Sequence, residues 1–110
     1  MTRPNEALLG ALDLLVLRTL SSRGALHGNA IASTIQQASG DTLRVEEGTL
    51  YPALHRMEKS RWVRATWRVT ESNRRVRNYA LTAAGRLRLE DAESQWARVT
   101  DGVARVLKFL

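Results

Sequence analysis

Arginine is concentrated in the middle of this 110-residue chain. Residues 44–77 hold nine basic and four acidic side chains, so they carry +5 of the total net charge of +6, and eight of the nine basic residues are arginines. The planar guanidinium group suits phosphate oxygens and guanine edges better than a lysine ammonium group does. A local excess of positive charge also releases counterions from a polyanion. This pattern indicates nucleic-acid binding, although a solvated basic surface is the plain alternative.

Part of this charge lies on a helix expected over residues 47–60. Its apolar residues share one face, which we expect to pack on the core. The remaining surface offers groups that can reach base edges and phosphates. We predict DNA contacts from Thr49, Tyr51, Pro52, His55, Arg56 and Lys59. The alternatives are that Tyr51 packs against a neighbouring hairpin and that the imidazole and the two cations form an ordinary solvated surface.

Two segments after this helix alternate with period two. Residues 62–68 and 76–81 flank a polar turn, which predicts an antiparallel hairpin over about residues 62–81. Arginines on it are candidates to contact the DNA backbone or the minor groove; they are Arg68, Arg74, Arg75 and Arg77. The aromatic residues Trp62, Trp67 and Tyr79 could stack on single-stranded bases, but we favour a role in anchoring the hairpin to the core.

The remaining elements give the order of a known architecture. We expect an apolar helix over about residues 7–20, a second helix over 28–38, a short strand over 42–45, and a final helix from 83 to 109 that Thr82 caps. This order predicts a mainly α (α+β) winged helix-turn-helix, with the helices at 28–38 and 47–60 as the DNA-reading pair. Residues 1–82 would form the DNA-binding domain. Residues 83–110 would add a C-terminal dimerisation helix to the same compact unit.

The last third of the chain carries a regular apolar seam. Its residues alternate at spacings of three and four over three heptads; they are Leu89, Ala92, Trp96, Val99, Val103, Val106 and Leu110. A seam this narrow predicts a homodimer through the terminal helices, to which Leu8 and Leu12 of the first helix would contribute. The alternative is that the same residues pack on the N-terminal helix of their own chain.

Several functional classes lack their necessary residues. The chain has no cysteine, and its two histidines, His27 and His55, have no ligand-type spacing, so we predict no metal and no cofactor. No nucleophile stands beside a plausible base and no glycine-rich phosphate loop is present, which argues against an enzyme. The apolar run over residues 7–17 is too short to span a bilayer, so we expect a cytoplasmic protein without a membrane partner.

Three segments resemble the PadR family of bacterial transcriptional regulators. Residues 47–58, EGTLYPALHRME, are similar to the recognition-helix signature of that family, and this match is the specific one. Residues 26–31 resemble the opening of its second helix, and residues 74–85 resemble its wing and the junction to the last helix. Asn29 departs from the aromatic residue that is common at its position. The single terminal helix is similar to the shorter subfamily.

The resemblance implies a homodimeric regulator, usually a repressor, that binds double-stranded DNA at an inverted-repeat operator and dimerises through its first and last helices. Several members release DNA on binding a small phenolic or other aromatic effector. Trp96 lies on the apolar seam, so it is a candidate for an effector pocket between the two protomers, with dimer packing as the alternative. The competing functional hypothesis is a winged-helix protein-interaction module that does not bind DNA.

Overall fold

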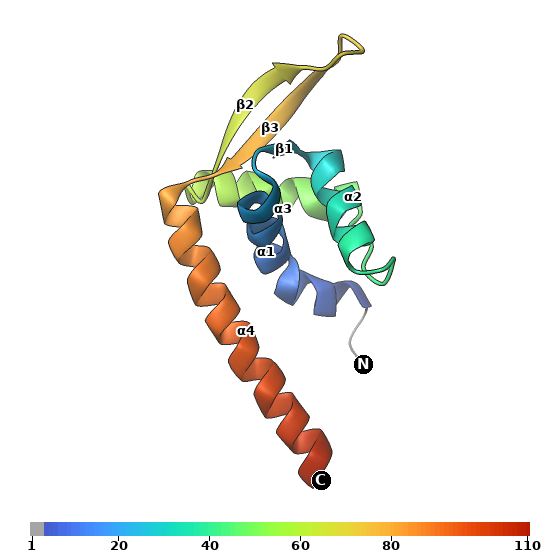
Figure 1. The fold of residues 1–110 in the computed structure, drawn as a ribbon, viewed down its shortest axis with the longest axis vertical. Helices are drawn as coiled ribbons and strands as arrows, with labels where there is room; N and C mark the ends of the chain where they lie inside the picture. Colours follow the sequence, from blue (N-terminus) through green and yellow to red (C-terminus); the bar gives the residue numbers. More distant parts are fainter. Residues whose placement is uncertain (1–3) are drawn as a thin grey trace.

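The computed structural model describes the backbone of residues 4–110 and the side chains of residues 11–110. Its helices are α1 (Pro4–Arg23), α2 (Gly28–Ala38), α3 (Glu47–Lys59) and α4 (Ala83–Phe109), and its strands are β1 (Leu26–His27), β2 (Val63–Val69) and β3 (Arg75–Leu81) (Figure 1). The strands form one antiparallel sheet in the order β1-β3-β2. A mainly α fold with a small antiparallel sheet is what the sequence predicts.

Helix α1 lies at the centre of the core. Its apolar residues face several directions, and it contacts α2, α3, α4 and β3. Most of its side chains from residue 11 onward are therefore buried or half-buried. The core residues that it buries are Leu12, Val16, Leu17 and Leu20, and they pack with Ile31, Ile35, Leu50, Leu54, Met57, Val63, Tyr79 and Leu89 from the other elements. Helices α1, α2 and α3 therefore share one core.

The strand expected over residues 42–45 does not form. The chain instead forms β1 at residues 26 and 27, where Leu26 pairs with Tyr79 and His27 pairs with Asn78. Strand β3 is then the central strand, paired with β1 on one side and with β2 on the other, and residues 42–45 stay in the loop between α2 and α3. In that loop Val45 is buried as part of the hydrophobic core, and Leu43 packs against the same core. A two-residue strand has no periodicity that the sequence could reveal.

The β2–β3 hairpin, called the wing below, extends beyond the helices. Its register runs from Val63 opposite Leu81 to Val69 opposite Arg75, and Figure 1 shows its turn projecting away from the body of the protein. Near the base of the wing Tyr79 is buried and Trp62 packs against the core. Trp67 is 60% exposed, so the expectation that it anchors the hairpin is wrong. At Trp67 the wing has already passed the edge of the core.

Helix α4 begins at a fixed point beside the turn between α3 and β2. The Thr82 hydroxyl accepts a hydrogen bond from the Gly85 amide at 3.0 Å, as an N-cap residue should. It also lies 2.6 Å from the carbonyl oxygen of Arg61, to which it can donate. A Cβ atom on Gly85 would clash with the backbone carbonyl of Trp62. The direction of α4 is therefore set where the wing ends.

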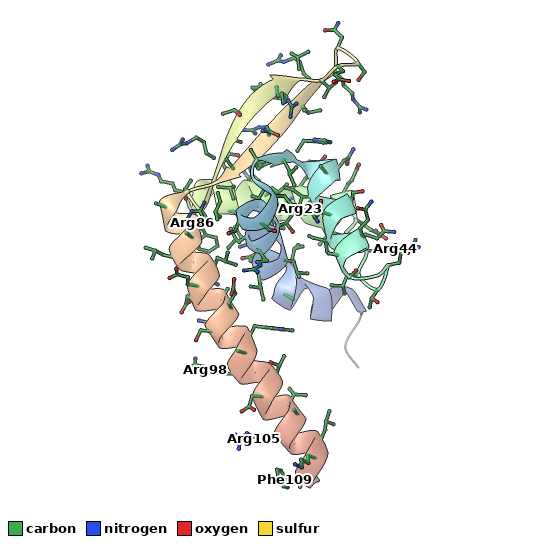
Figure 2. All side chains as sticks on the ribbon, viewed as in Figure 1. Arg23, Arg44, Arg86, Arg98, Arg105 and Phe109 are labelled. Atoms are coloured by element: carbon green, nitrogen blue, oxygen red, sulfur yellow. The ribbon has the colours of Figure 1, made fainter. Side chains whose placement is uncertain are left out.

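The two halves of α4 have different surroundings. The first half packs along α1, and Leu89 is buried there. The second half extends away from the other elements, and Figure 2 shows Arg98, Arg105 and Phe109 along this projecting part. The molecule is consequently elongated, with extents of 56 × 28 × 22 Å.

Candidate nucleic-acid interface

Helix α3 divides into a buried face, an exposed face and two flanks. Leu50, Ala53, Leu54 and Met57 are buried, as their spacing predicts. Pro52, His55 and Lys59 are exposed on the side away from the core. One flank carries Tyr51, which lines a pocket together with residues of the wing. The other flank carries the half-buried Thr49.

On the wing flank, two contacts connect α3 to other parts of the domain. Glu58 accepts a hydrogen bond from Arg77 of the wing, with 2.9 Å between its Oε2 and Nη2 of the arginine. The ring of Tyr51 lies against Gly28 at the start of α2, where an added Cβ atom would come within 2.8 Å of it. Gly28 therefore leaves the space that Tyr51 occupies, and both contacts fix the position of α3 relative to its neighbours.

A groove of about 300 Å³ separates the wing from the start of α2. Gly28 and Tyr51 line one side, and Arg74, Arg75 and Arg77 line the other. The first turn of α2 has no acidic residue, and the side chain of its N-cap residue makes no capping hydrogen bond. Amide groups at a helix N-terminus favour an anion. Both sides of this groove therefore favour negative charge.

Wing residues on the groove side form a stack. The guanidinium carbon of Arg75 lies 4.5 Å from the centre of the Trp67 ring, and that of Arg77 lies 5.6 Å from it. Arg68 is exposed on the opposite face of β2, because successive side chains of a strand alternate. Arg74 is exposed in the turn. The structure thus brings Arg74, Arg75 and Arg77 together and sets Arg68 apart from them.

Arg56, the arginine of α3, points to α1. Both terminal nitrogens of Arg56 donate to the carboxylate of Asp13, at 2.6 and 2.9 Å. This hydrogen bonding raises the pKa of the Arg56 side chain and keeps it charged. Its place in the sequence predicts that Arg56 faces DNA, whereas in the structure it lies on the flank away from the wing and binds Asp13. Asp13 was visible in the sequence only as an interruption of an apolar run.

Beside this ion pair lies a cavity of about 290 Å³ between α1, α3 and α4. Its lining includes Arg56, Arg88, Gln95, Trp96 and Val99. Trp96 was predicted as a candidate effector contact. It lines this cavity together with Arg56 of α3, within one chain. The polar residues of the lining were not identified from the sequence, because they come from three separate helices.

The residues predicted for dimerisation lie in different environments. Leu12 and Leu89 are 1% and 5% exposed inside a single chain, so they have no surface left for a second chain and that prediction is wrong for them. The side chain of Leu8 lies outside the described residues. Ala92 is half-buried, and the other members are exposed; these are Trp96, Val99, Val103, Val106 and Leu110.

The described residues were compared with the requirements of a metal site and of a membrane-spanning helix. Among the side chains that the structure describes, no three histidine, aspartate or glutamate residues gather in a way that could hold a metal ion. Within the described part of the chain, no helix combines the length and the apolar character needed to cross a membrane.

A winged helix with an exposed third helix and a basic wing is the architecture of a DNA-binding transcription regulator. The chain belongs to the PadR-like family: a family model described as "Transcriptional regulator PadR-like family" matches residues 16–91. This match confirms the family predicted from the sequence.

Solved structures of similar proteins agree with this assignment. A PadR family transcriptional regulator from Eggerthella lenta superimposes with a TM-score of 0.81 and 28% identity, over 96% of this chain and 89% of that one. A transcriptional regulator from Clostridium thermocellum gives a TM-score of 0.81 and 25% identity, over 96% and 98% of the two chains.

Among curated proteins, a protein of transposon Tn4556 from Streptomyces fradiae, described as an uncharacterized 37.1 kDa protein, is 41% identical over 101 residues. The match covers 92% of this chain but only 26% of that protein. "Uncharacterized protein X" of Lysinibacillus sphaericus is 24% identical over 88% of both chains.

Proposed function

We propose that the protein is a cytoplasmic repressor that binds an inverted-repeat operator in double-stranded DNA as a homodimer. The observation that carries this proposal is the surface that combines the exposed face of α3 with the groove side of the wing. There His55 and Lys59 project from α3, and Arg74 and Arg75 project from the wing. The helix would enter the major groove and read base edges, while the wing would contact the backbone or the minor groove.

Within this surface we assign base contacts to Thr49, Tyr51, Pro52, His55 and Lys59, and backbone or minor-groove contacts to Arg74 and Arg75. Arg68 lies on the opposite face of the wing, so we assign it at most a peripheral backbone contact outside this surface. Arg56 and Arg77 take another role, because each is paired with an acidic side chain from a different element. We assign these two arginines to holding α3 against α1 and against the wing.

Dimerisation through α4 is supported by its exposed apolar residues. Val99, Val103 and Val106 are each more than half exposed, and they lie on one side of the helix at heptad spacing. A contiguous apolar surface of this kind marks a protein interface. A second α4 presents the same surface, so a symmetric dimer would cover both.

We further propose that the cavity beside Trp96 takes a small aromatic effector. An aromatic ring could lie against Trp96 and Val99, while Arg56, Arg88 and Gln95 offer hydrogen bonds to its polar groups. Because Arg56 belongs to α3, a ligand that engages it would compete with Asp13. The ligand would then weaken a contact that positions the DNA-reading helix.

The test is an electrophoretic mobility shift with DNA from upstream of the coding sequence, followed by footprinting. We expect saturable binding that survives an excess of unrelated DNA, and protection of two inverted half-sites. Lys59→Ala should weaken binding to this DNA more than to unrelated DNA, whereas Glu90→Ala, a change on α4 away from the proposed surface, should leave both unchanged. Absence of DNA binding would favour the protein-interaction module instead.

A further inference from the structure

Trp67 is the one large aromatic side chain that the wing exposes among the described residues. It is 60% exposed, although a tryptophan on a strand usually packs against a core. What covers part of it is a pair of arginines from the neighbouring strand. Arg77 lies directly opposite Trp67 in the hairpin register, and Arg75 is its diagonal neighbour two residues earlier.

The two arginines are held in different ways. Arg77 is bound by Glu58 of α3 and lies 5.6 Å from the tryptophan ring centre. Arg75 lies closer to the ring, at 4.5 Å, and makes no ion pair with any side chain that the structure describes. Its guanidinium therefore keeps its hydrogen-bond donors available while the flat ring restricts its motion.

Both arginines line the groove that faces the start of α2. The ring of Trp67 lies beneath Arg75, so it determines where that charge sits over the groove. An unsupported arginine on a projecting hairpin would lose several rotatable bonds of freedom on binding a phosphate. A side chain that is already ordered loses less, which raises affinity without adding a contact.

We propose that Trp67 is a positioning residue for DNA binding: its ring holds the guanidinium of Arg75 over the groove, where a backbone phosphate of double-stranded DNA would lie. The Glu58–Arg77 ion pair fixes the distance of this stack from α3. The proposal rests on the proposed function, and it assigns Trp67 an effect that operates only through Arg75.

The experiment measures binding to a short random-sequence DNA duplex by fluorescence anisotropy, between about 50 and 200 mM salt. Trp67→Phe keeps an aromatic face under Arg75, and Trp67→Leu keeps apolar bulk without one. We expect Trp67→Leu to weaken binding about two- to five-fold, the value of one exposed cation–π contact, and to reduce the salt dependence although no charge is lost. Trp67→Phe should retain most of the affinity.

Arg75→Ala and Arg68→Ala form the matched pair, because they remove the same charge from opposite faces of the wing. Arg75→Ala should reduce affinity more, and adding Trp67→Leu to it should cause no further loss. An equal effect of Trp67→Leu with and without Arg75 would mean that the tryptophan contacts DNA itself and would overturn the proposal. Unchanged affinity and salt dependence in Trp67→Leu would overturn it as well. Failure of the unmodified protein to bind any duplex would refute the proposed function instead.

Discussion

Residues of the same type have different roles on this surface, and their partners decide which. Arg56 and Arg77 look like DNA contacts by their position in the sequence, yet each binds a carboxylate from another element, Asp13 and Glu58 respectively. Arg75 has an aromatic ring as its neighbour instead. A charged side chain that is already paired gains less from a phosphate, because the existing pair must first be broken. The candidate DNA contacts are therefore the cations that no carboxylate holds among the described residues.

The contribution of the Asp13–Arg56 ion pair to stability can be tested by mutation. Asp13→Asn and Arg56→Gln should each lower the free energy of unfolding by about 0.5–1 kcal/mol, since the pair is bidentate but partly exposed. The double variant should lose little more than either single variant, because both changes remove the same interaction. Urea unfolding followed by circular dichroism measures these values. Arg56→Gln should also preserve the preference for the operator over unrelated DNA. A loss of that preference would show that Arg56 contacts bases.

Long periodic helices and strands were predictable from the sequence, whereas very short elements and contacts between distant parts of the chain were not. The bounds of α2 and α4 follow from their apolar spacing and from the Thr82 cap, and the observed ranges are 28–38 and 83–109. Strand β1 is defined only by its pairing with β3, so no local signal marks it. The alternation of residues in β2 predicted on which face of the sheet Trp67 lies. It did not show that the core ends before this position, which leaves Trp67 exposed. Likewise, the helical spacing of α3 gave its flanks but not the aspartate that faces Arg56.

The junction between the wing and α4 can be tested through one glycine. Gly85→Ala should lower the free energy of unfolding by about 2–3 kcal/mol, because the new methyl group meets the rigid backbone carbonyl of Trp62. Gly102→Ala in the same helix is the matched control, since nothing lies within 4 Å of the position of its Cβ. This control should be neutral or stabilising by up to about 1 kcal/mol. Similar losses in both variants would show that α4 is not fixed at Gly85.

For the whole molecule, the projecting half of α4 determines the expected assembly. Val99→Glu with Val103→Glu should give a monomer in sedimentation velocity, because a dimer would bury unpaired charges at its seam. Leu87→Glu is the control, since Leu87 is 69% exposed near the start of the same helix and outside the seam. It should remain a dimer. A stable dimer of the double variant with normal operator binding would rule out the heptad seam as the interface.

The proposed dimer would also fix how the operator is arranged. In a symmetric dimer a two-fold axis relates the two α3 helices, so the half-sites are inverted copies. Both helices reach one face of the DNA only if the half-site centres lie about 10 bp apart or a multiple of that distance. Because α4 begins at a fixed point beside the wing, the α4 pair would set the distance between the two wings. The proposed effector, by displacing Asp13 from Arg56, would shift DNA affinity by no more than its difference in affinity between the DNA-competent and incompetent dimers.

Operator spacing variants test this arrangement. Inserting roughly five base pairs between the half-sites turns one of them to the opposite face of the duplex, so tight binding should be lost. Inserting about ten base pairs returns both half-sites to one face of the duplex but increases the distance between them. The distance between the two DNA-binding surfaces of the dimer is fixed, so affinity should recover only in part. Titration of labelled operators at constant salt measures both, with a half-site deletion as the reference for binding by one protomer. Affinity that survives the shorter insertion undiminished would mean that the two protomers bind independently of each other.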